Sequence, residues 1–322
     1  MRLGRIIVIV VLAGTVAGGM TACLAGNAAD DLNPLAVSVV SSRQDMVTGG
    51  DALLLVDLRG HDSEQVSVTV NGSDVAAMFR ETHDGQFVGL VTGLEYGVND
   101  VVVAVDSDTV SQALRLVNHS AAGPVFSGPH EQPFICETET FELVSGETLD
   151  DSLDQDCSIA RRVDYAYRSI DDDALKPLSD PGQLPENIAT VTTLAGHEVP
   201  YVVRIETGTV NRAIYQIAML HAPGSDGLAP SPWMRSPGWN GRLIYTFGGG
   251  CVNGWYRQGN TTGGVTDDVM LRQGYAVASS SLNVYGNNCN DVLAAETMMM
   301  VKERFIEAYG VPRYTIGWGC SG

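Results

Sequence analysis

The sequence predicts an exported protein built from an N-terminal all-β sandwich and the first half of a mostly parallel α/β sheet. Three observations point to this fold class. Short strands separated by turns precede residue 118, strands and helices alternate after residue 140, and the last strand ends in the turn "GCSG". The predicted segments are a signal peptide (1–23), a sandwich (34–118), a linker (119–140) and an α/β domain (141–322).

The composition excludes several classes of partner. The 322 residues contain 19 Lys and Arg against 38 Asp and Glu, which gives a formal net charge of −19. We expect no nucleic-acid partner, because phosphate contacts need clustered Lys and Arg. We expect no metal and no cofactor, because the sequence has no His-x-x-x-His pair and its "GGG" lacks the Lys of a phosphate-binding loop.

The first residues indicate export. Arg2 and Arg5 precede the apolar run "IIVIVVLAGTVAGG", which is typical of a signal peptide. The stretch "MTAC", which ends at Cys23, is similar to a bacterial lipobox, whose Cys carries a lipid after cleavage. Lipidation of Cys23 and plain secretion both stay open. In either case we expect an extracellular or cell-surface protein, attached to a membrane only through a lipid on Cys23.

The remaining cysteines could form disulfides, which persist in an oxidising compartment such as the cell exterior. Local pairing would join Cys136 to Cys157 and Cys251 to Cys289, and would leave Cys320 alone. Sequence does not fix disulfide connectivity, so these pairs are a hypothesis.

Residues 34–118 predict an immunoglobulin-like sandwich. They contain no helical pattern, and turn signals such as Asn71-Gly72 and Asp84-Gly85 separate short runs rich in β-branched residues. The predicted strands are "LAVSVVSS", "DALLLVDLRG", "QVSVTVNG", "QFVGLVTGL" and "NDVVVAVDS".

Residues 141–322 predict the first part of an α/β domain. Its strands are "VPYVVRIETG", "RAIYQIAML", "GRLIYTFGGG", "YAVASSSLN" and "RYTIGWG". The run "NDVLAAETMMMVKERFIEAYG" predicts a helix that Asn290 or Asp291 caps and Gly310 ends. The residues assigned to its buried face are Val292, Ala295, Met299, Phe305 and Ile306.

The turn after the last strand carries the candidate nucleophile. Strand-Gly-X-Ser-Gly is the pattern of the nucleophile elbow in α/β-hydrolases, where a sharp turn projects the serine from the sheet. Gly319 occupies the position two residues before Ser321. Cys320 is a poorer candidate nucleophile, because the bulky Trp318 would then occupy the crowded position two residues before the nucleophile.

The loop Gly248–Gly250 predicts an oxyanion hole. Acyl transfer builds negative charge on a carbonyl oxygen, which needs preorganised N–H donors after the third strand and after the serine. The expected donors are Gly249, Gly250 and Gly322. Trp255 and Tyr256 either line a substrate pocket or pack, and both alternatives stay open.

Four stretches resemble known families. The turn "GCSG" resembles that of the tannase and feruloyl-esterase group of secreted α/β-hydrolases, and "GPVFSGPHEQPFIC", "FGGGC" and "IGWGCSG" resemble a family of secreted bacterial proteins of unknown function. The resemblance implies hydrolysis of an ester-bearing small molecule or polymer, with Ser321 as nucleophile. It also implies a disulfide between Cys320 and a downstream Cys beside the catalytic His.

The order of catalytic residues raises an alternative. α/β-hydrolases place Asp or Glu and then His after the serine, whereas His119, His130, His197 and His221 all precede Ser321. We therefore expect these 322 residues alone to be inactive and to fold poorly. The alternative function is a non-catalytic cell-surface binding protein with a decayed hydrolase core.

Overall fold

The computed structural model describes residues 35–82, 84–105, 110–222 and 230–321. The predicted signal peptide with Cys23, and Gly322, lie outside the described residues. Within those ranges, no helix is long and apolar enough to cross a membrane.

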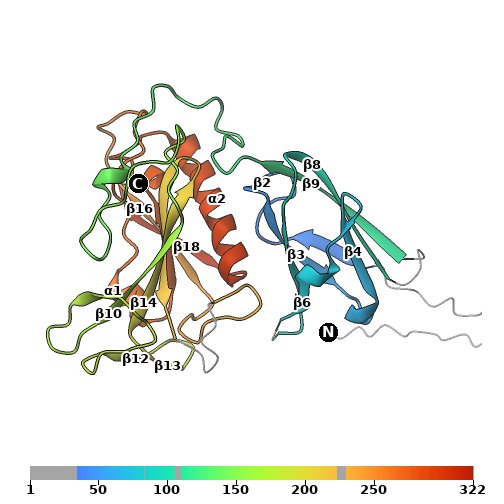
Figure 1. Ribbon diagram of the computed structural model, residues 1–322, viewed down its shortest axis with the longest axis horizontal. Coiled ribbons are helices and arrows are strands. Elements are labelled where there is room, and N and C mark those ends of the chain that lie inside the picture. The colour runs from blue at the N-terminus through green and yellow to red at the C-terminus, as the bar shows by residue number, and fades with distance from the viewer. Residues whose placement is uncertain (1–34, 83, 106–109, 223–229, 322) are drawn as a thin grey trace, which may run out of the picture. The chain divides into compact units, whose positions relative to one another are not determined.

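The N-terminal part of the chain forms two sheets that share one apolar core (Figure 1). The first has the order β1 (Ala36–Val39), β3 (Asp51–Asp57), β7 (Phe87–Thr92) and β6 (Phe79–Glu81). The second has the order β2 (Val47–Thr48), β9 (Val110–His119), β8 (Gly97–Val105), β4 (Val66–Val70) and β5 (Ser73–Asp74). Strand β8 buries every second residue from Asn99 to Val105, so only one of its faces meets the core.

A seven-stranded sheet follows in the chain. Its order is β11 (Leu175–Leu178), β10 (Arg162–Arg168), β14 (Val202–Val210), β15 (Ala213–Leu220), β17 (Ala276–Ser280), β16 (Leu243–Gly248) and β18 (Thr315–Cys320). A separate hairpin joins β12 (Thr190–Thr192) to β13 (Glu198–Pro200). The short 3₁₀ turns are η1 (Ser63–Gln65), η2 (Ala76–Met78), η3 (Thr138–Thr140) and η4 (Ser281–Asn283).

The predicted fold class is wrong. The described chain is mostly β-strand, and in the seven-stranded sheet only the pairs β16–β17 and β16–β18 are parallel. The physical reason is the two-residue turn Asn211-Arg212, whose φ angles of 51° and 63° suit a tight hairpin and make β14 and β15 antiparallel. Strands β10 and β11, which the sequence analysis missed, add two more antiparallel pairs. An immunoglobulin-like topology is not established either.

Two helices cover opposite faces of the seven-stranded sheet. Helix α2 (Asp291–Tyr309) packs Met300 and Phe305 in one apolar cluster with Tyr245. The five-residue helix α1 (Asp268–Arg272) packs in another cluster with Ile244, the neighbouring residue of β16. Because successive strand residues point to opposite faces, these two clusters lie on the two sides of the sheet.

Helix α2 begins and ends as predicted. The Asn290 side chain accepts a hydrogen bond from the backbone N–H of Leu293, and Gly310 caps the other end with a φ of 93°. The predicted buried face is right only in part. Phe305 and Ile306 are buried, but Val292 is 52% exposed while Leu293 is buried, because three inward carboxylates interrupt the apolar stripe and obscure its period.

One of these carboxylates anchors the segment before residue 136. Glu296 is fully buried and accepts hydrogen bonds from the backbone N–H groups of residues 125–127 and from the Ser127 hydroxyl. A buried charge is tolerable only when it is hydrogen-bonded in this way. The segment "GPVFSGPH" is therefore fixed to α2.

The other two inward carboxylates face the N-terminal strands. Glu303 accepts hydrogen bonds from the backbone N–H and the hydroxyl of Thr48 on β2. Burial, together with the like charge of Asp51 on β3, raises the pKa of Glu303 to about 7. Glu307 is 5% exposed, and burial and the charge of Glu303 raise its pKa well above the ordinary value. Its Oε1 has no hydrogen-bond partner among the described residues.

We expect this carboxylate cluster to make the protein less stable as the pH rises. The folded-state pKa values lie above the unfolded ones, so the stability they contribute is complete below the unfolded pKa of about 4.5 and is lost as the pH rises through about 7. The Glu307→Gln variant should remove much of this dependence and be more stable than the wild type at pH 8, by about 1–3 kcal/mol.

Urea unfolding at pH 5 and pH 8 measures both effects. The control is Glu186→Gln, at an exposed glutamate, which should leave the difference between the two pH values unchanged. A Glu307→Gln protein that loses as much stability as the wild type between pH 5 and pH 8 would contradict the assignment.

Candidate active site

The candidate site lies where two parallel strands end side by side. Strands β16 and β18 pair in register, with Gly248 opposite Cys320. The chain then turns at Ser321, whose φ of 57° lies in the left-handed region that residues with a side chain rarely adopt. A serine in a strained turn directly after a strand is the local geometry that the nucleophile-elbow pattern predicts.

The loop after β16 touches this turn. A Cβ atom built on Gly249 would lie 2.7 Å from the Cβ of Ser321 and 2.8 Å from the carbonyl oxygen of Cys320. No side chain fits at such distances, so the backbone approaches Ser321 as closely as a glycine permits. The structure thus brings Ser321 and Gly249 together.

The segment after η4 holds the glycine loop from its other side. The backbone N–H groups of Tyr285 and Gly286 donate to the carbonyl oxygens of Gly248 and Gly249, both at 2.9 Å. A Cβ on Gly250, whose φ is 130°, would lie 2.4 Å from the Cα of Gly286. The loop is fixed by backbone contacts on two sides.

The N–H groups of the loop differ in their surroundings. Among the described residues, the Gly250 N–H donates no hydrogen bond, whereas the Gly249 N–H faces the Cys320 carbonyl oxygen at the last rung of the β16–β18 ladder. A donor beside a serine could bind an oxygen that carries developing negative charge. The third expected donor, Gly322, lies outside the described residues.

A disulfide locks the same loop. Cys251 is bonded to Cys289, and the Trp255 indole N–H donates to the Cys289 carbonyl oxygen at 2.7 Å. The Cys136–Cys157 disulfide is also present, so both hypothesised pairs are confirmed. Cys320 is a free, exposed thiol.

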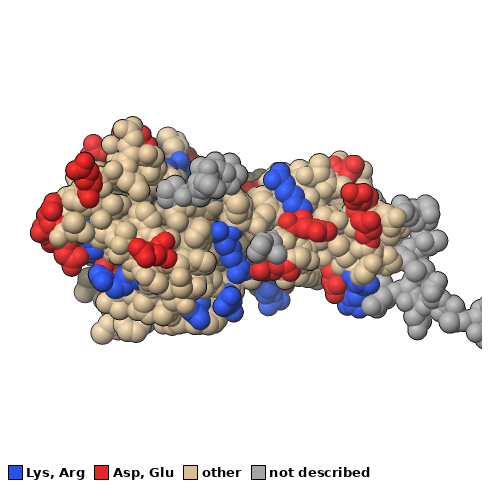
Figure 2. Space-filling model, turned by 90° about the horizontal axis from the view of Figure 1, so that it is seen from below, with Lys and Arg blue, Asp and Glu red and all other residues tan. Residues whose placement is uncertain are grey.

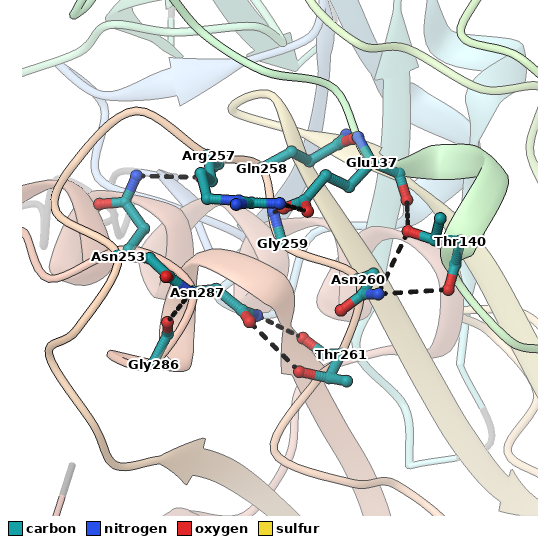
Figure 3. A network of polar contacts seen from close by, with 11 residues as sticks. Glu137, Thr140, Asn253, Arg257, Gln258, Gly259, Asn260, Thr261, Gly286 and Asn287 are labelled. Atoms are coloured by element: carbon teal, nitrogen blue, oxygen red, sulfur yellow. Dashed lines mark hydrogen bonds and ion pairs between the residues drawn. The ribbon is translucent and has the colours of Figure 1, made fainter.

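A polar network ties this loop to the segment that precedes the sheet (Figure 3). Arg257 and Glu137 form an ion pair, and the Glu137 carboxylate also accepts from the backbone N–H of Gly259. The ion pair raises the pKa of Arg257 above its ordinary value. Figure 3 also shows Asn260 reaching Thr140. The sequence analysis missed this network, although Asn and Gly are frequent at residues 253–260 and 286–290 and such composition indicates structured turns.

Two aromatic residues follow the disulfide without forming a core. Trp255 is 47% and Tyr256 is 48% exposed. The indole is held at its N–H, whereas much of its ring remains accessible. Packing alone therefore does not account for these residues.

The histidines lie elsewhere. His119 contacts the carbonyl oxygen of Asp45, and His197 lies in the turn between β12 and β13. Burial, with the nearby charge of Arg212, lowers the pKa of His130, and burial also lowers that of His221. Among the described residues, no histidine or carboxylate hydrogen bonds to Ser321.

We predict that a methyl group at Gly319 or Gly249 disrupts the site, whereas one at Gly317 does not. A Cβ on Gly319 would lie 2.9 Å from the Cβ of Phe247, but one on Gly317, in the same strand, meets only ordinary contacts at 3.5 Å. The Gly319→Ala and Gly249→Ala variants should lose about 1–3 kcal/mol of unfolding free energy, and Gly317→Ala should stay within about 0.5 kcal/mol. Urea unfolding measures this, and equal stability of all three variants would show that the close approach is absent.

Comparison with known proteins supports the family resemblance. No curated protein matches the chain. Residues 37–322 match a family described as a tannase-like family of unknown function (DUF6351). Since the match spans most of the chain and includes both Ser321 and the glycine loop, the protein belongs to this tannase-like family.

Proposed function

We propose that the protein is an exported ester hydrolase in which Ser321 is the nucleophile. The observation that carries this proposal is the contact between the strained turn at Ser321 and the backbone of Gly249. Membership of a tannase-like family supports ester hydrolysis as the reaction class. The proposed substrate is an ester-bearing small molecule or polymer.

The chemistry proceeds in two steps. The Ser321 oxygen attacks the ester carbonyl carbon and loses its proton, and the bond to the alcohol breaks as the alcohol leaves with a proton. Water then attacks the acyl-serine, which releases the carboxylic acid and restores the hydroxyl. In both steps the carbonyl oxygen becomes negatively charged, and the N–H groups of Gly249 and Gly250 would bind it.

The glycine loop needs rigidity for this role. Donors lower the barrier only when they already point at the developing charge, so that no reorganisation is needed during the reaction. The Cys251–Cys289 disulfide and the bonds from Tyr285 and Gly286 supply that rigidity. The proposal assigns the nucleophile and two oxyanion donors, and it assigns no general base.

The two disulfides also support the proposed location. Disulfides persist in oxidising compartments such as the cell exterior and are rare in the cytosol. An extracellular or cell-surface hydrolase would meet polymeric esters that do not enter cells. Attachment through a lipid on Cys23 remains part of this proposal.

A fluorophosphonate probe tests the nucleophile. Full-length protein should be labelled, and the Ser321→Ala variant should lose at least 95% of the label, on the order expected when the attacking oxygen is removed. The matched control is Ser111→Ala, at an exposed serine on β9, which should label like the wild type.

Two outcomes would overturn the proposal. Labelling that survives in Ser321→Ala would place the reactive group elsewhere. A correctly folded wild-type protein that takes no label would favour the alternative, a non-catalytic cell-surface binding protein.

A further inference from the structure

A cavity lies at the opposite end of β18 from Ser321. Arg313 lines this cavity just before β18 begins, whereas Ser321 follows the end of that six-residue strand. The cavity has a volume of about 460 Å³, within the usual range for small-ligand sites. Its walls include Thr82, Asp84 and Gln86, residues 232–235, and both Val311 and Arg313.

Two guanidinium groups converge at this cavity. A Cβ built on Gly241 would lie 3.5 Å from Nη1 of Arg235 and 3.5 Å from Nε of Arg313, so these two nitrogens are no more than about 7 Å apart. Arg235 is held in place, because its Nη2 donates to the carbonyl oxygen of Val311 at 3.1 Å and its guanidinium lies over the Trp239 ring. The Arg313 side chain makes no hydrogen bond within the described residues.

Neither arginine forms an ion pair with a described carboxylate. Two adjacent cations repel each other, and an anion placed between them would convert that repulsion into two charge-assisted hydrogen bonds. On the face drawn in Figure 2, acidic groups are dense at the left end and basic groups gather near the middle. In a chain with a net charge of −19, unpaired neighbouring arginines therefore indicate an anion site.

Other residues that line the cavity suit a hydroxylated ring. Trp233 is fixed by a hydrogen bond from its indole N–H to the Val88 carbonyl oxygen at 2.9 Å, and Arg80 lies 5.0 Å from the ring centroid. Because Arg80 covers one face of this ring, a flat ligand would lie against the other face. Thr82, Asp84 and Gln86 supply hydrogen-bond donors and acceptors that a plain aromatic acid would leave unused.

We propose that this cavity binds an acidic sugar, with its carboxylate between Arg235 and Arg313 and its ring against Trp233. Asp84 and Gln86 would accept hydrogen bonds from the sugar hydroxyls. The site is separate from Ser321 and does not depend on the proposed reaction. A uronate-containing polysaccharide is thus the class of polymer that the protein would hold.

Titration calorimetry with digalacturonate tests the proposal on the full-length protein. Digalacturonate should bind, and cellobiose, its neutral counterpart in size, should bind at least tenfold more weakly. The Arg313→Gln variant, at an exposed and unbonded side chain, should weaken digalacturonate binding at least tenfold. The control Arg115→Gln, at an exposed arginine paired with Asp100, and Ser321→Ala should leave it unchanged.

Further ligands separate the remaining outcomes. Benzoate and inorganic phosphate, added singly at the same concentrations, should bind at least tenfold more weakly than digalacturonate. Equal binding of either anion would show a general anion site and overturn the assignment to a sugar. Digalacturonate binding that is absent, or is insensitive to Arg313→Gln, would overturn the site itself.

Discussion

The approach of the Gly249 backbone to Ser321 is the constraint on which the candidate site depends. Parallel pairing of β16 with β18 makes both strands end at the same level, and only a residue without a side chain fits between the two turns. The carbonyl groups of Gly248 and Gly249 bond to the segment after η4, whereas the Gly250 N–H donates to no group among the described residues. The Cys251–Cys289 disulfide restricts movement of the glycine loop away from Ser321.

Helix α2 is joined to the rest of the chain by buried polar side chains as well as by apolar packing. Glu296 holds residues 125–127, Glu303 holds Thr48, and Arg304 pairs with the buried Glu206 of β14. Burying charged groups is costly unless each is bonded, so removing one partner should cost more than the bond contributes. Glu307 is the exception, because its Oε1 has no hydrogen-bond partner among the described residues. Its raised pKa makes the stability of the folded chain depend on pH.

The sequence predicts local features here better than it predicts the sheet. Helix α2 and its cap at Asn290 follow from side-chain chemistry close in the chain, and both disulfides join cysteines that are neighbours in the sequence, as the local-pairing hypothesis had it. The strand directions did not follow, because the turn Asn211-Arg212 lacks the glycine that usually indicates a tight hairpin. The ion pair of Glu137 with Arg257 joins residues 120 positions apart, and no local pattern indicates such a contact.

The most direct test of the central claim is to locate a trapped acyl group. Full-length protein is incubated briefly with p-nitrophenyl acetate, quenched in acid and digested with trypsin, which cuts after Arg313 and yields a peptide that begins at Tyr314. Fragmentation of this peptide distinguishes acylation of Ser321 from acylation of Cys320. The account predicts an acetyl group on Ser321 that appears at once and is absent from Ser321→Ala. An acetyl group found only on Cys320, or on no residue of this peptide, would contradict it.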